Sequence, residues 1–167
     1  MMRKKRIYTV AAVCLLVFLY MMIFLLSSDV AEDSSMKSSA VTELLLKIWS
    51  FFQNSDGTPT TEIVVDLFPL EKIVRKLAHF FEYLCVGLLS YSLVLMWWKG
   101  KVWSGRLLIG VQLLLSASLD GIHQYFVPGR YAAVKDVFID CAGGITGMVI
   151  IGMAFTLRRH KKSPVPL

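Results

Sequence analysis

The sequence predicts an all-α fold, an integral membrane bundle of four transmembrane helices. Its 167 residues are 56% hydrophobic and have a mean hydropathy of +0.60, which is too apolar for a soluble domain of this length. Four apolar runs are long enough to cross a bilayer. Cationic residues gather beside alternate runs, as they do in membrane proteins of fixed orientation. We expect the spans at about residues 7–26, 75–98, 106–126 and 137–157.

The charge and the cysteine content argue against other classes of protein. The net charge of +6 comes from residues that flank apolar runs, so they do not form the soluble basic face that nucleic-acid binding requires. The three cysteines, Cys14, Cys85 and Cys141, lie inside apolar runs without paired spacing. They therefore indicate packing residues rather than a disulfide framework or a zinc site.

The first element predicted is an N-terminal anchor helix over residues 1–26. Four cationic side chains in residues 1–6 precede twenty residues without a charge, 7–26. The apolar region of a signal peptide usually covers only about 7–15 residues. Asp29 also stands where a cleavage site requires a small residue. We therefore expect this helix to be retained in the mature protein.

Residues 27–68 form the one long hydrophilic region, predicted to be an acidic extracytoplasmic loop. Within it, apolar residues recur at helical spacing and predict an amphipathic interfacial helix over about 40–52. These apolar residues are Val41, Leu44, Leu45, Ile48, Trp49 and Phe52. Pro69, followed closely by Glu71, indicates that the second membrane helix begins before the apolar run does.

The distribution of charge predicts the orientation. With four spans and a cytoplasmic N-terminus, the inner segments 1–6, 99–106 and 158–167 hold eleven Lys and Arg residues and no Asp or Glu. The outer segment 27–76 holds eight acidic residues against five basic ones. This is the positive-inside pattern. We expect a multi-pass plasma-membrane protein with both termini cytoplasmic and a basic tail over 158–167.

Polar residues of three spans are predicted to lie in one layer beneath the outer surface. A helix rises about 1.5 Å per residue, which places the deeper polar positions of these spans, His79, Glu82, Asp120, His123 and Asp140, roughly 5–10 Å below the outer boundary. On each helix these residues also share a face. The residues are Arg75, His79, Glu82 and Tyr83 on the second span, Asp120 and Gln124 on the third, and Asp136 and Asp140 on the fourth.

At these positions the chain resembles the VanZ-like family, small bacterial membrane proteins named for a factor in low-level teicoplanin resistance. The resemblance covers residues 69–157 and depends on three motifs in order. They are Arg75-Lys-x-x-His79-Phe-x-Glu82-Tyr83, Asp120-x-x-x-Gln124-x-x-x-Pro128-Gly129-Arg130, and Asp136-x-x-x-Asp140-x-x-Gly143-x-x-x-Gly147. The chain departs from the family pattern at Gly121, where an acid is usual, and at Asp140, where Asn is usual. The resemblance implies a membrane domain with an envelope role and implies no particular reaction.

The favoured interpretation is an outward-facing site for an anionic ligand. Arg75, Lys76 and Arg130 would bind a phosphate, pyrophosphate or carboxylate of a membrane lipid or a lipid-linked cell-wall precursor. Proton-transfer candidates are His79, Glu82 and Asp120. The full set of predicted ligand-binding residues is Arg75, Lys76, His79, Glu82, Tyr83, Asp120, Gln124, Arg130, Asp136 and Asp140.

Two alternatives remain open. The first is a membrane enzyme acting on a phospho-head group, with metal assistance from some of His79, Glu82, Asp120, His123, Asp136 and Asp140, although the basic residues oppose a cation there. The second is a scaffold or small transporter in which the polar layer joins the helices. No cofactor and no committed metal site are predicted. Gly143 and Gly147 are predicted to allow close helix packing.

Overall fold

The computed structural model describes residues 2–29, 36, 39–48, 67–130 and 133–162, and all the regular structure in these ranges is helical. The long helices are α1 (Met2–Ser28), α3 (Leu67–Trp97), α4 (Val102–Tyr125) and α5 (Val134–Lys162). All four are long and apolar enough to cross a membrane. The predicted all-α fold with four spans is confirmed. Most helices extend beyond the predicted spans, because hydropathy marks the apolar stretch while backbone hydrogen bonding continues into the charged flanks.

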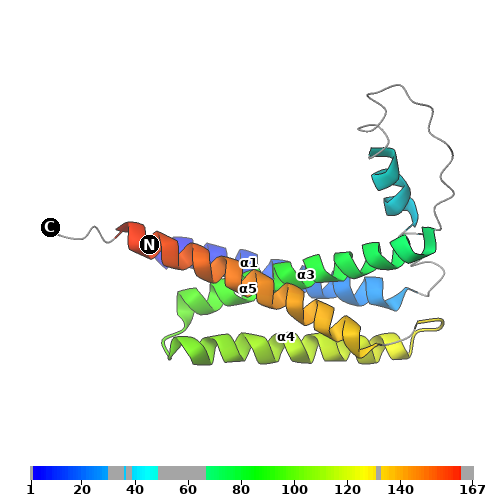
Figure 1. Cartoon of the computed structure of the whole chain (residues 1–167). Helices are drawn as coiled ribbons and strands as arrows, with labels where there is room; N and C mark the ends of the chain where they lie inside the picture. Colours follow the sequence, from blue (N-terminus) through cyan, green and yellow to red (C-terminus); the bar gives the residue numbers. More distant parts are fainter. Residues whose placement is uncertain (1, 30–35, 37–38, 49–66, 131–132, 163–167) are drawn as a thin grey trace, which may run out of the picture.

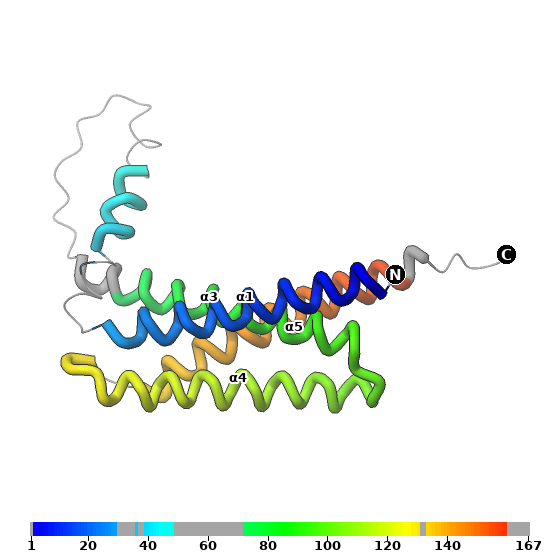
Figure 2. The backbone as a smooth tube through the Cα atoms, turned by 180° about the vertical axis from the view of Figure 1, so that it is seen from behind, coloured from blue at the N-terminus to red at the C-terminus, as the bar shows by residue number. Residues whose placement is uncertain are grey.

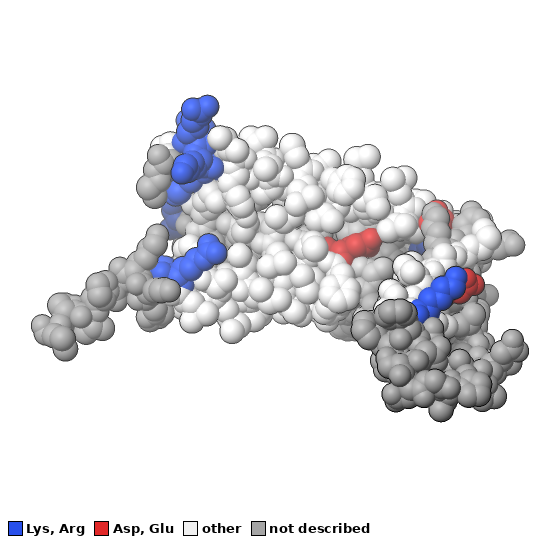
Figure 3. Space-filling model, turned by 90° about the horizontal axis from the view of Figure 1, so that it is seen from above, with Lys and Arg blue, Asp and Glu red and all other residues white. Residues whose placement is uncertain are grey.

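The four long helices run side by side and divide the bundle into two chemically different ends (Figures 1 and 2). We call one the basic end; it holds the start of α1, the turn from α3 to α4, and the end of α5. We call the other the polar end; it holds Ser28, the start of α3, Tyr125 and Val134. Lys and Arg gather at the basic end, and acidic and basic side chains mix at the polar end (Figure 3).

Buried residues of α1, α3 and α4 form the core, partly buried residues of α5 pack against it, and the outside of the bundle is apolar. The buried cluster consists of Ile23, Tyr83, Val86, Tyr91, Ile109, Leu113 and Ala117. Large apolar side chains such as Leu107, Leu119 and Phe138 are exposed on the outer faces of the helices. A bundle that is apolar both inside and outside is suited to a lipid environment, because lipid tails solvate those outward side chains.

Glycines bring α3 and α5 into backbone contact, and these helices form the most extensively packed pair. A Cβ on Gly143 would overlap the Phe80 carbonyl oxygen, and one on Gly147 would overlap that of Leu84. On α3, Gly87 likewise lies against the backbone of Gly144. The absence of side chains at these positions is therefore what allows the two helices to approach so closely.

Polar contacts attach α1 to the other helices along its length. Near the basic end, Tyr8 and Ser92 share a hydrogen bond of 2.7 Å between their hydroxyl groups. Farther along, the Nε2 of Gln112 on α4 donates to the Tyr20 hydroxyl on α1 at 2.9 Å and to the Ser90 hydroxyl on α3 at 3.1 Å. The N-terminal helix is thus a packed member of the bundle.

The predicted interfacial helix is present over residues 39–48; the predicted residues 49–52 lie outside the described part of the chain. It lies beyond α1 in the chain and stands across the long axis of the bundle at its polar end (Figures 1 and 2). Val41, Leu44, Leu45 and Ile48 on it are exposed. This direction agrees with a helix that lies along a membrane surface.

Candidate functional site

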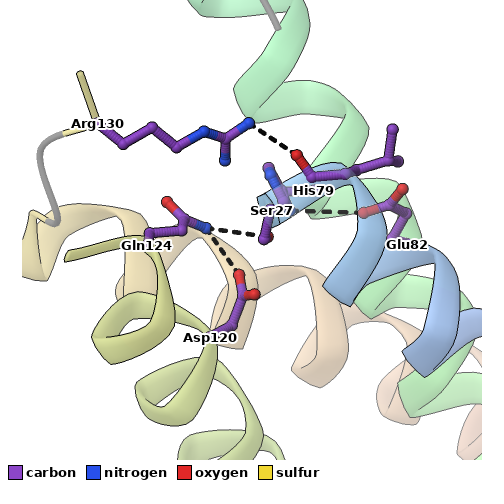
Figure 4. A network of polar contacts seen from close by, with 7 residues as sticks. Ser27, His79, Glu82, Asp120, Gln124 and Arg130 are labelled. Carbon is purple, nitrogen blue, oxygen red and sulfur yellow. Dashed lines mark hydrogen bonds and ion pairs between the residues drawn. The ribbon is translucent and has the colours of Figure 1, made fainter. Parts of the chain in front are cut away.

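The candidate site is a cluster of polar side chains at the polar end of the bundle, supplied by α1, α3, α4 and the turn before α5. Figure 4 shows its members Ser27, His79, Glu82, Gln124 and Arg130 lying together, with Asp120 beside them. The sequence predicted that three of the spans would contribute to such a layer. The structure adds the end of α1.

Gln124 connects α4 with α1 through a single amide nitrogen. Its Nε2 donates to the Oδ2 of Asp120, one turn earlier on α4, at 2.8 Å. The same nitrogen donates to the Ser27 hydroxyl oxygen at 3.2 Å. Both acceptors are buried, and an amide nitrogen carries two protons, so one side chain satisfies two buried groups. Gln124 therefore holds the Asp120 carboxylate in a fixed position.

His79 and Glu82 form a pair within α3. The Nδ1 of His79 lies 3.4 Å from the Oε2 of Glu82, and the two side chains are 13% and 17% exposed. The two atoms are buried, and neither has a well-formed hydrogen bond to the described residues. The pair thus combines ion-pair distance with unused hydrogen-bonding capacity. Such capacity is costly in a buried place unless a further group uses it.

Arg130 reaches from the turn between α4 and α5 to the end of α1. Its Nη2 donates to the Leu26 carbonyl oxygen at 2.7 Å. The last carbonyls of a helix have no partner within the helix, so this bond satisfies one of them. Burial and the neighbouring Arg75 lower the pKa of Arg130, and Asp29 and Asp120 act in the opposite direction. The Arg130 guanidinium therefore lies in surroundings that an additional negative charge would improve.

The start of α5 contributes a second pair and a buried acid. Lys76 on α3 forms an ion pair with Asp136 on α5, and each side chain is 33% exposed. One turn farther along α5, Asp140 is 5% exposed. Asp120 acts electrostatically on both Asp140 and His79. Asp120 on α4 and Asp140 on α5 are therefore close enough to interact electrostatically with each other, and Asp120 also interacts with His79 on α3.

The structure does not give all predicted site residues the same position. Tyr83 is 1% exposed and belongs to the apolar core. Arg75 is half-buried near Arg130. His123 is used to attach α1: its Nε2 lies 3.0 Å from the Ser28 hydroxyl, and its ring stacks on Phe24 with the centroids 4.5 Å apart. Within the described residues, no three His, Cys, Asp or Glu side chains are placed to hold a metal ion.

The contribution of α1 was missed in the sequence. Ser27 is completely buried beside Gln124, and the Leu26 carbonyl accepts from Arg130. The available signal was the pair of serines that ends the first apolar run, at the same predicted depth as Gln124. A backbone carbonyl gives no signal in the side-chain pattern.

Fold and site together define a polytopic α-helical membrane protein with a buried ionisable cluster at one end. The chain belongs to the VanZ/LLP1 family, whose model matches residues 12–155. The match begins within α1, so it includes the helix that completes the cluster and extends beyond the predicted family region of 69–157. No curated protein and no solved structure matches the chain.

Proposed function

We propose that this VanZ-family protein binds the anionic head group of a membrane lipid or lipid-linked envelope precursor at its polar end. The ligand groups in this proposal are Arg130 and Arg75, with His79 and Glu82 beside them. The proposal extends family membership and membrane helices to a specific ligand class, and it depends on a buried ionisable pair, His79 and Glu82, that lies within one helix.

The observation that carries the proposal is that the His79–Glu82 pair lies within one helix. Gln124 joins α4 to α1, and Lys76 joins α3 to Asp136 on α5, so adhesion explains those residues. A pair three residues apart on α3 joins no two helices. Burying ionisable groups costs on the order of several kcal/mol each, which adhesion does not repay here. A ligand that hydrogen-bonds to His79 and Glu82 would offset this free-energy cost.

The charge around Arg130 favours an anion. Arg75 and Arg130 repel each other, and burial adds to the cost of the Arg130 charge. A phosphate or carboxylate between two guanidinium groups removes that repulsion and accepts paired hydrogen bonds. Of the acids nearby, Asp136 pairs with Lys76 and Asp120 accepts from Gln124, while Asp29 offsets part of the cost of the Arg130 charge.

The orientation supports an envelope ligand. The segments at the basic end carry eleven Lys and Arg residues and no acid, which favours a cytoplasmic position for that end. The polar end then faces outward, where lipid-linked cell-wall precursors are exposed. Together with family membership, this supports a contribution to teicoplanin-type glycopeptide resistance or to envelope stress tolerance.

A second candidate function is a reaction at a phospho-head group. It is favoured by the 3.4 Å approach of His79 Nδ1 to Glu82 Oε2, which suits a proton-transfer pair, with Asp120 close by. A metal-assisted version has no donor set among the described residues. Turnover of a labelled lipid head group by purified protein distinguishes this candidate from binding alone.

The test compares glycopeptide susceptibility and membrane abundance in cells that express His79→Gln or Glu82→Gln. Both substitutions keep the size of the side chain approximately and remove its ionisable group. We expect resistance to be lost while the amount of protein in the membrane stays normal. Loss of the protein from the membrane would instead indicate that the pair serves adhesion, as in the scaffold alternative.

A further inference from the structure

A second site lies at the basic end, in a groove between α3, α4 and α5. Two adjoining cavities of about 450 and 410 Å³ open there. Both are lined by Tyr91 of α3, Arg106 of α4, and Gly152 and Thr156 of α5, so they form one continuous groove. Its lining residues belong to the end of α3, the start of α4 and the end of α5, so the groove is at the opposite end of the bundle from the cluster of His79 and Arg130.

The packing of α3, α4 and α5 around Tyr91 forms the groove. Gly152 faces the buried ring of Tyr91, and a Cβ there would lie 3.3 Å from the ring. The Tyr91 hydroxyl accepts a hydrogen bond of 3.3 Å from the Nε of Arg106. This bond holds the Arg106 guanidinium against the groove.

The charged residues that line the groove in the described part of the chain are all basic. Arg159 also lines it, and the guanidinium lies 5.9 Å from the ring centroid of Phe155. None of the residues that line the two cavities is acidic. Two arginines without a carboxylate form a place for an anion, and phosphate matches the guanidinium geometry.

The walls of the groove are apolar and as long as one leaflet. Along α5 they extend from Met148 to Arg159, a difference of eleven positions, or about 16 Å at the helical rise. The hydrocarbon of one leaflet is roughly 15 Å thick, half of a bilayer core. Met153 and Leu157 on this wall are exposed, so they offer their surface to an acyl chain.

We propose that this groove binds an anionic phospholipid from the leaflet at the basic end, with its phosphate between Arg106 and Arg159 and an acyl chain along α5. Basic pockets between transmembrane helices recognise anionic head groups in this way. The proposal does not depend on the function of the polar end. The lipid would act as a structural ligand that joins α4 to α5 at this end of the bundle.

The experiment measures thermal unfolding of the full-length protein in neutral detergent with added phosphatidylglycerol, phosphatidylcholine of the same chains, or inorganic phosphate. We expect phosphatidylglycerol alone to raise Tm, by about 2–4 °C or more. The rise should disappear in Arg106→Gln/Arg159→Gln and persist in Lys99→Gln/Arg158→Gln, which removes two charges from the same end but none from the groove. An equal rise with phosphatidylcholine or inorganic phosphate, or an unchanged rise in the first variant, would overturn the proposal.

A second variant keeps both arginines and fills the groove. Thr156→Phe places a ring among the lining residues, and we expect it to abolish the response to phosphatidylglycerol. Thr146→Phe is its control, because both threonines donate to the carbonyl oxygen four residues earlier on α5 and only Thr156 lines the groove. A normal response in Thr156→Phe, or the same loss in both variants, would contradict a lipid in this groove.

Discussion

The guanidinium of Arg130 donates a 2.7 Å hydrogen bond to the backbone carbonyl of Leu26, more than one hundred residues earlier in the chain. This contact joins the turn that carries the third-span motif to the last turn of the N-terminal helix. The α1 helix, within which the family match begins, supplies an acceptor for Arg130 and the buried hydroxyl of Ser27. The first helix is therefore part of the candidate site as well as a membrane anchor.

The Arg130 contact leads to the first prediction. Arg130→Lys keeps the positive charge but loses the planar guanidinium that spans the turn and the Leu26 carbonyl. We expect the free energy of unfolding in detergent to fall by about 1.5–3 kcal/mol, the value of a hydrogen bond that involves a charged group. Thermal or denaturant unfolding measures this. Unchanged stability would mean that the contact contributes nothing to the attachment of α1.

The Gln124 amide gives a second prediction. Gln124→Leu removes the donor shared by Asp120 and Ser27, which leaves a buried carboxylate and a buried hydroxyl without it. We expect a loss of about 1–3 kcal/mol in unfolding free energy. In a double-mutant cycle with Ser27→Ala, the coupling should be about 0.6 kcal/mol, as for other hydrogen bonds between membrane helices. A coupling of zero would show that the hydrogen bond between Gln124 and Ser27 does not stabilise the packing of α4 against α1.

The close approach of α3 and α5 gives a third prediction with an internal control. Gly143→Ala places a methyl group against the Phe80 carbonyl, so the helices must separate. We expect a loss of about 1–3 kcal/mol, typical of overpacking. Gly110→Ala should be neutral, because a Cβ on Gly110 meets nothing within 4 Å. Equal effects at the two positions would contradict the packing described for α3 and α5.

A fourth prediction concerns the ion pair between Lys76 and Asp136. Both side chains are one-third exposed, so solvent screens the pair, and we expect it to contribute no more than about 1 kcal/mol. Asp136→Lys should destabilise the protein by placing a like charge beside Lys76. The double reversal Lys76→Asp/Asp136→Lys should recover most of the loss. Failure of the reversal to recover stability would indicate that Asp136 interacts mainly with another group.

Four spans and the polar layer were predictable because they depend on side-chain type and spacing. Hydropathy located the helices, and the one-face spacing of His79 with Glu82 and of Asp120 with Gln124 placed those residues in the same layer. The contribution of α1 to the candidate site was not predictable in this way. Leu26 contributes a backbone carbonyl, which side-chain spacing does not show, and serines such as Ser27 are common at the ends of spans. The groove at Tyr91 and Arg106 depends on how three helices pack, which residue spacing along one helix does not report.

The fifth prediction concerns orientation. If the basic end is cytoplasmic, a fluorescent protein fused after Leu167 should fluoresce, and an alkaline phosphatase fused at the same position should be inactive. A phosphatase inserted in the loop after Gly57 should be active. The reverse pattern would place the cluster of His79 and Arg130 on the cytoplasmic side and remove the access to exposed envelope precursors.

The most direct test of the ligand site is a mass-spectrometric comparison of the lipids retained by purified wild-type protein and by the His79→Gln/Glu82→Gln variant. Because this pair joins no two helices, the variant should keep the wild-type unfolding temperature and lose one class of anionic lipid or precursor. Lipids held in the groove at the basic end should be retained by both proteins. Identical lipid profiles, or a variant that is depleted only because it no longer folds, would contradict the account.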